Sequence, residues 1–236
     1  MNKVSRAGVA LLLLGLMFLA TGCATVVPNI SAGQKFWSDK QHAIGVAVIK
    51  LPAAGAHKSG SQGLLDIAIN NSMASDLETH LSQQDVTKIE NLADKIASYL
   101  QEKGFEVKRI SDQVDPEAFP EQEASGGGKH YSLRDYSSLK EQHGIEKLVL
   151  LSINQIGTIR SYYGFIPTSS PAGYASLNGQ VINLTTAELE WNQNAVQQTP
   201  SAESEWDVPP DFPGLTQAME MAFDNSRQVI FNNFIQ

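Results

Sequence analysis

Histidine and carboxylate side chains are the residues that metal or acid–base chemistry would need in this chain. The five histidines are scattered, and no two form the H-x-x-x-H or H-E-x-x-H spacing of a zinc site. Asp76, Glu78 and His80 alternate, a spacing that turns them to different faces of a helix. Asp135 and His143 would form an acid–base pair only if the fold brought them together. We therefore predict no metal site and no cofactor.

Serine and lysine residues form three short combinations that suggest nucleophilic chemistry. They are Ser137-Ser138-Leu139-Lys140, Ser152-Ile153-Asn154 and Lys58-Ser59-Gly60. They resemble the S-x-x-K, S-x-N and K-[ST]-G signatures of penicillin-binding proteins, and the resemblance implies a serine nucleophile acting on the cell wall. In that family the lysine triplet lies late in the chain and the nucleophile opens a helix. Here the triplet comes first and Ser137 is expected inside a helix, so exposed helix and loop residues explain these matches better.

The only cysteine, Cys23, ends a stretch typical of an export signal. Lys3 and Arg6 precede an uncharged apolar run from Ala7 to Ala20. That run is shorter than the roughly 20 residues that span a bilayer, and it suits the core of a secretory signal peptide. It leads into Ala20-Thr21-Gly22-Cys23, which resembles the lipobox of bacterial lipoproteins. The resemblance implies cleavage before Cys23, a diacylglycerol thioether on its sulfur and acylation of its new amino group.

The predicted anchor also implies a location and a net charge for the mature protein. By analogy with lipoproteins, Ala24 in place of Asp after the cysteine favours the outer membrane, with the body on the periplasmic side. Removal of residues 1–22 takes away Lys3 and Arg6 and no acidic residue, so the net charge of −8 becomes −10. Such a chain disfavours nucleic acid as a partner and is not drawn to anionic lipid. We therefore expect residues 23–40 to be a tether that holds the body away from the membrane.

Apolar aromatic residues gather in a segment that reads as a loop. The segment Tyr162-Tyr163-Gly164-Phe165-Ile166-Pro167 is followed by Pro171-Ala172-Gly173-Tyr174. Contiguous exposed apolar residues often mark interfaces, and aromatic residues dominate their binding energy. The alternative is a loop that folds back and caps the core. If the loop is an interface, its anchors are Tyr162, Tyr163, Phe165 and Tyr174.

Hydrophobic periodicity predicts the elements that position these residues. Apolar runs predict buried strands over 42–51 and 147–153, the second continuing toward residue 162. A strand over 105–110 and a hairpin over 180–191 complete the sheet. Helical spacing predicts helices over 64–81, 85–100, 133–143 and 215–234. Polar, Gly- or Pro-bearing stretches predict loops at 53–60, 111–130, 164–173 and 192–214.

The predicted fold class is α/β. Strands separated by helices favour parallel pairing, so we expect one mixed sheet with parallel strands, flanking helices, an antiparallel hairpin and a C-terminal helix. Residues 41–236 would form a single periplasmic domain. This order of elements resembles the small α/β domain of envelope lipoproteins such as the curli secretion lipoprotein. It also resembles the N-terminal domain of the Tol–Pal propeller protein. Residues 184–191 look like their strand–turn–strand segment, with Thr186 where those proteins usually carry Gly.

Three functions remain open from the sequence. The leading one is a non-enzymatic structural, assembly or adaptor component of the cell envelope, with envelope proteins or further copies of itself as partners. The second is a hydrolase acting on the cell wall, which needs Asp135, Ser137 and His143 within mutual reach. The third is a small-ligand binding module, which needs a deep apolar pocket beside the hairpin.

Overall fold

The computed structural model describes residues 27–201 and 208–236, so the predicted signal peptide and the lipobox with Cys23 lie outside the described residues. The sheet strands are β1 (Ile44–Val48), β2 (Gly55–Ser61), β3 (Val107–Arg109), β6 (Lys147–Tyr163), β7 (Ile166–Pro167), β8 (Ala172–Asn183) and β9 (Leu189–Pro200). The helices are α2 (Gln34–Ser38), α3 (Leu64–Met73), α4 (Ser75–Ser82), α5 (Lys88–Glu102), α6 (Ser138–His143) and α7 (Pro213–Phe234). Within these residues no helix has the length and apolarity needed to cross a membrane.

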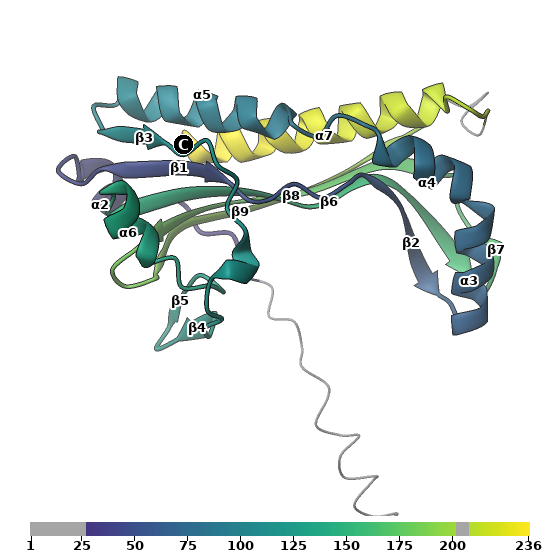
Figure 1. Cartoon of the computed structure of the whole chain (residues 1–236), viewed down its shortest axis with the longest axis horizontal. Coiled ribbons are helices and arrows are strands. Elements are labelled where there is room, and N and C mark those ends of the chain that lie inside the picture. The colour runs from purple at the N-terminus through teal and green to yellow at the C-terminus, as the bar shows by residue number, and fades with distance from the viewer. Residues whose placement is uncertain (1–26, 202–207) are drawn as a thin grey trace, which may run out of the picture.

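A seven-stranded mixed sheet organises the chain, which confirms the predicted α/β class (Figure 1). The main path runs β3-β1-β6-β8-β9, with β3, β1 and β6 parallel and β6, β8 and β9 antiparallel. The separate pair β4 (Ser125–Gly126) and β5 (Lys129–His130) forms a small antiparallel sheet. The long strand β6 is central, because β1 pairs with its first half and β2 with its second.

Both faces of the sheet are buried near its centre, as the unbroken apolar runs of β1 and β6 predicted. Val46, Val149 and Leu151 face the cluster formed with α5 and α7. Ala47 and Leu148 face a second cluster, formed with α6 and the loops around it. Figure 1 shows the corresponding layers, with α5 and α7 side by side over one face of the sheet. A strand covered on both sides gains nothing from a polar face, which is why its sequence does not alternate.

The expected tether over residues 23–40 is wrong for the described part, which packs on the sheet. Asn192, fully buried on β9, exchanges backbone hydrogen bonds with Ile30 at 2.7 and 3.0 Å, and its Nδ2 donates to the Pro28 carbonyl at 2.7 Å. Phe36 of α2 is 2% exposed and stacks on Phe105 at a centroid distance of 5.5 Å. Residues 27–40 show no hydrophobic periodicity, so their sequence resembles that of a loop. In the structure they cover one end of the core.

The predicted loop over residues 53–60 is also wrong, because it forms β2. Seven residues of β2 pair in parallel with β6, from Gly55 opposite Gly157 to Ser61 opposite Tyr163. Gly157 has φ of +134°, and a Cβ there would lie 1.9 Å from the Gly55 carbonyl oxygen, so only glycine permits this approach. The glycines and polar residues of β2 hide it from a propensity argument, since tertiary pairing decides the strand.

Other predicted boundaries of helices, strands and loops also differ from those in the structure. The loop predicted at 192–214 begins only after Pro200, because β9 stays paired with β8 along its whole length. The helix predicted over 133–143 is reduced to α6. The stretch 111–130 is irregular, with one turn of 3-10 helix at Pro116–Ala118 and the β4–β5 pair. In the β8–β9 turn the left-handed conformation falls on Ala187, at φ of 58°, rather than on Thr186.

Candidate binding pocket

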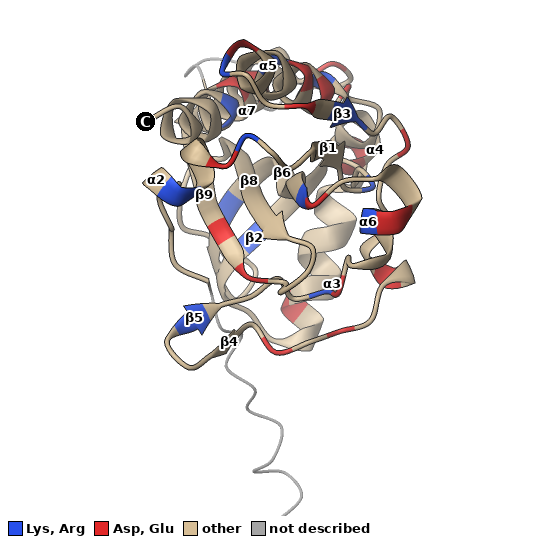
Figure 2. Ribbon diagram, turned by 90° about the vertical axis from the view of Figure 1, so that its left-hand side faces the viewer, with Lys and Arg blue, Asp and Glu red and all other residues tan. Residues whose placement is uncertain are grey.

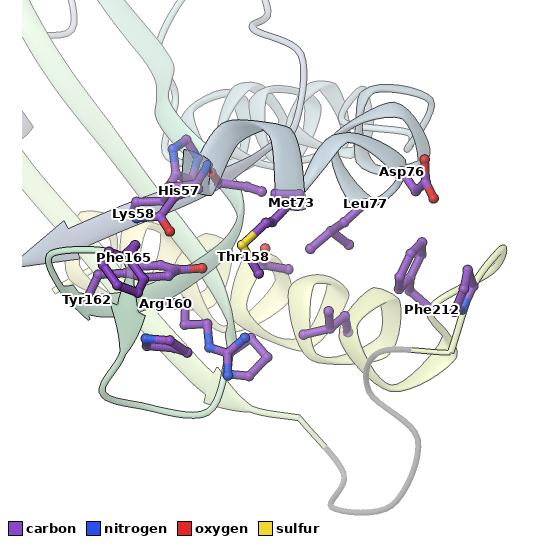
Figure 3. Close-up of a pocket in the computed structure, with 17 residues that line it drawn as sticks. His57, Lys58, Met73, Asp76, Leu77, Thr158, Arg160, Tyr162, Phe165 and Phe212 are labelled. Atoms are coloured by element: carbon purple, nitrogen blue, oxygen red, sulfur yellow. Dashed lines mark hydrogen bonds between the residues drawn. The ribbon is translucent and has the colours of Figure 1, made fainter. Parts of the chain in front are cut away.

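A cavity of about 330 Å³ opens at the far end of β6, where β2, α3, α4, β7 and the start of α7 meet (Figure 3). The site exists because β6 continues well past the region that β1 covers, and β2 then becomes its partner. The turn between β6 and β7 folds back at Gly164, whose N–H donates to the Ser61 carbonyl at 2.8 Å. This contact closes the end of the cavity beside α3.

Asn70 fixes α3 to this turn. Its Nδ2 donates to the Gly164 carbonyl at 3.2 Å and to Gln62 Oε1 at 2.8 Å. Because both partners are acceptors, this side-chain atom is the amide nitrogen and the other is Oδ1. Asn70 is 1% exposed and lines the cavity, and its Oδ1 has no hydrogen-bond partner among the described residues. A buried acceptor without a partner is costly, and the two hydrogen bonds from Nδ2 hold the turn against this cost.

Basic side chains line one wall of the cavity. His57, Lys58 and Arg160 come from the paired strands β2 and β6. His57 Nε2 lies 2.9 Å from the Ile156 carbonyl, so this nitrogen carries the proton, and Arg160 Nε donates to the Ser169 carbonyl at 2.9 Å. Among the described residues of the lining, Asp76 is the one acidic residue. Lys58 favours a group with negative charge at this wall.

Apolar side chains form the opposite wall and the mouth. Leu77, Phe212 and Leu215 lie deeper, while Met73 of α3 and Phe165 of the turn lie at the mouth. Figure 3 shows Met73 and Leu77 from the helical side and Tyr162 and Phe165 from the strand side of the same cavity. Met73 is 78% exposed and Phe165 56% exposed. An apolar lining with a few convergent polar groups is the usual make-up of a binding site.

The aromatic loop divides between two surroundings. Tyr162 and Phe165 line the cavity, and Tyr163 points away from it with 72% exposure. Tyr174 lies on β8 and packs its ring edge-on against His57 at 5.8 Å, so it supports the basic wall. Only part of the set therefore forms one exposed surface.

Sequence reasoning missed the contribution of α3. Helical spacing predicted a stripe from Leu64 through Met73 to Leu81, and only Leu81 is buried. Leu64 is 90% exposed and Leu65 74% exposed. Two adjacent leucines at the start of a helix were a usable signal, because an ordinary amphipathic stripe does not place neighbours on one face.

The candidate catalytic groups do not converge. Ser137 donates its backbone N–H to Asp135 Oδ1 at 2.9 Å within one turn, a contact that lowers the pKa of Asp135, and no bond joins either to His143 among the described residues. Lys140 pairs with Glu146 at 2.7 Å instead of with Ser137. Lys58 and Ser59 lie on β2 opposite Arg160 and Ser161, and Ser152 lies in the first half of β6, about 26–30 Å away at ~3.3 Å per residue.

Metal-binding geometry is likewise absent from the described residues. No group of three His, Cys, Asp or Glu side chains is placed to hold an ion within residues 27–201 and 208–236. His80 Nε2 lies 2.8 Å from Thr216 Oγ1, and Glu78 accepts the Ala56 N–H at 2.6 Å. These two side chains hold α4 to α7 and to β2.

Comparison with known proteins gives structural similarity alone. A scan against protein-family models finds no match, and a search of curated proteins finds none. Similar solved structures include a variant of the PelC dodecamer from Paraburkholderia phytofirmans, at 7% identity over 89% of this chain and 95% of that one, with a TM-score of 0.33. Protein XCC0632 from Xanthomonas campestris has 12% identity over 82% and 84%, with a TM-score of 0.37.

A third similar structure is lipoprotein GNA1162 from Neisseria meningitidis, at 14% identity over 78% of this chain and 99% of that one, with a TM-score of 0.32. With identities this low and TM-scores below 0.5, none of these proteins assigns a function to the chain.

Proposed function

We propose that this chain is a lipoprotein of the bacterial outer membrane that faces the periplasm and acts as a non-enzymatic adaptor. Its pocket between α3, β6 and β7 would receive a segment of an envelope protein. The observation that carries the proposal is the open cavity with one basic wall, one apolar wall and exposed apolar residues at its mouth. The anchor is acylated Cys23, inferred from the lipobox.

The shape of the site favours a protein segment over a small molecule. A small ligand usually has 70–90% of its surface buried in an enclosed cavity. Here Met73 and Phe165 extend the apolar surface beyond the cavity to the outside. A peptide that places an apolar side chain in the cavity and an acidic one against Lys58 and Arg160 would use both walls.

Substitution of Met73 tests the proposal with a matched control. Met73→Asp places a charge at the mouth, while Met221→Asp changes another helical, 49% exposed methionine, on α7. Full burial of a methionine contributes about 1.5–3 kcal/mol, so Met73→Asp should weaken partner binding by about tenfold or more. Binding of the lipidated variants to envelope extract would be measured beside their thermal unfolding. Equal binding by both folded variants would contradict the proposal.

A small-ligand binding module is the second candidate. The size of the cavity favours it, because about 330 Å³ lies within the range of roughly 300–1,000 Å³ that ligand pockets occupy. Native mass spectrometry of protein purified from its own cells would detect a bound molecule. Leu77→Trp, which fills the cavity, should abolish any added mass, and an unliganded native protein would argue against this candidate.

A further inference from the structure

A second apolar surface lies outside the pocket, on the outward side of α3. It comprises Leu64 and Leu65 of α3 with Tyr163 and Ile166 of the β6–β7 turn, and we refer to these four residues as the apolar tip. Their exposed fractions are 90, 74, 72 and 55%. None of the four lines the pocket. Such a contiguous patch on a secreted domain is a contact surface.

We propose that the apolar tip rests in the interfacial layer of the bilayer that holds Cys23. This rests on the lipid anchor of the proposed function. Aliphatic residues beside a tyrosine are the usual composition of a segment at a membrane surface, where the tyrosine ring is half in apolar and half in wet surroundings. Figure 2 shows α3 almost free of charge, with Asp66 as its one acidic position. Asp66 Oδ2 accepts the Gly63 N–H at 2.8 Å and so caps the helix.

The length of the anchor brings the membrane close. Three residues, 24–26, separate Cys23 from Val27, which is buried against the sheet. A fully extended chain spans at most about 3.6 Å per residue, so Val27 lies within about 14 Å of the acylated cysteine. The domain therefore cannot stand far from the bilayer.

The apolar tip and the attachment point of the anchor lie toward the same side of the molecule. Val27 belongs to the core cluster on the face opposite α5 and α7. Figure 1 shows α3 continuing the layer of α7 and α4 around the curled end of the sheet, so that α3 begins at the lower right, on the side away from α5 and α7. A membrane that holds Cys23 therefore lies on the side toward which the apolar tip projects. Since the mature chain is acidic, apolar insertion and not attraction to anionic lipid drives this contact.

A fluorescent label in the tip tests the contact. Cys23 is the only cysteine and is acylated, so Leu65→Cys offers one free thiol for an environment-sensitive dye. Met221→Cys is the matched control on α7, away from the start of α3 (Figure 1). The full lipidated proteins would be reconstituted into vesicles of phosphatidylethanolamine and phosphatidylglycerol. We expect a lipid-borne quencher to reduce the signal at position 65 several-fold more than at 221, with little change at high salt.

Each of the other outcomes refutes a specific part of the inference. Equal quenching at both positions in protein that floats with the vesicles refutes the tip contact and leaves the anchor intact. Protein that does not float with the vesicles refutes the anchor, and with it the adaptor proposal at the membrane. A label at 65 that is shielded without vesicles as protein concentration rises shows that a second copy covers the tip, which also overturns the inference.

Discussion

Replacing Phe36 by alanine tests whether the segment after the lipidation site is part of the folded domain. Phe36 is almost fully buried, with Phe105 and Trp37 at ring-centroid distances of 5.5 and 4.8 Å and Phe234 at 6.3 Å. Loss of a fully buried phenylalanine costs about 3–5 kcal/mol in a core that relaxes only in part. That is a large share of the ~5–15 kcal/mol by which domains are stable.

The expected effect is large enough for thermal unfolding to measure. In a chain of this size 1 kcal/mol shifts Tm by about 2–4 °C, so Phe36→Ala should lower Tm by about 6–20 °C. Phe165→Ala is the matched control, because the same atoms leave an exposed position and the expected cost is below about 1 kcal/mol. A segment that acted as a free tether would tolerate both changes alike. A Phe36→Ala shift no larger than that of Phe165→Ala would refute the docked segment and the closeness of the membrane that follows from it.

Four further predictions concern stability. Lys147 is buried and pairs with Asp39 at 3.0 Å and with Glu190 at 2.8 Å, so Lys147→Ala should cost about 1–3 kcal/mol in urea unfolding, because these partly buried carboxylates lose their shared cation. Burial alone would raise the pKa of Asp39, but hydrogen bonds from Lys147 and His42 lower it overall; its contribution is therefore complete above about pH 4 and lost as pH falls through the lowered pKa. Burial raises the pKa of Tyr136 to about 12. The free energy of unfolding is therefore unaffected by this group below about pH 10 and falls by about 2–3 kcal/mol toward pH 12, because the unfolded chain ionises first. Tyr136→Phe should remove this alkaline loss of stability. Ala187→Gly should raise the unfolding free energy by about 1 kcal/mol, since alanine is strained at φ of 58°, and an unchanged Tm would contradict that reading of the turn.

The central sheet was predictable because its strands are covered on both faces. The apolar runs at 42–51 and 147–153 left no doubt about burial, and β1 and β6 pair in parallel as expected. The C-terminal helix was predictable from the stripe that now packs in the core, which includes Met219, Ala222 and Ile230. In each case a strong local pattern agrees with the tertiary fold.

The pocket was not predictable, since its walls depend on contacts that no local pattern encodes. β2 has a polar, glycine-containing sequence and becomes a strand through pairing with the far half of β6. α3 has apolar residues at helical spacing, yet no partner element covers its outward face. The sequence could not separate Tyr162 and Phe165 of the aromatic loop, which line the cavity, from Tyr174, which packs against His57.

The most direct test of the adaptor claim is photo-crosslinking in living cells. A photoreactive residue would replace Met73 at the pocket mouth in one strain and Met221 on α7 in another. We expect position 73 to crosslink to one envelope protein and position 221 not to, and we expect Phe165→Ser to remove the adduct while the protein stays folded. No adduct at position 73, or the same adducts at both positions, would contradict it.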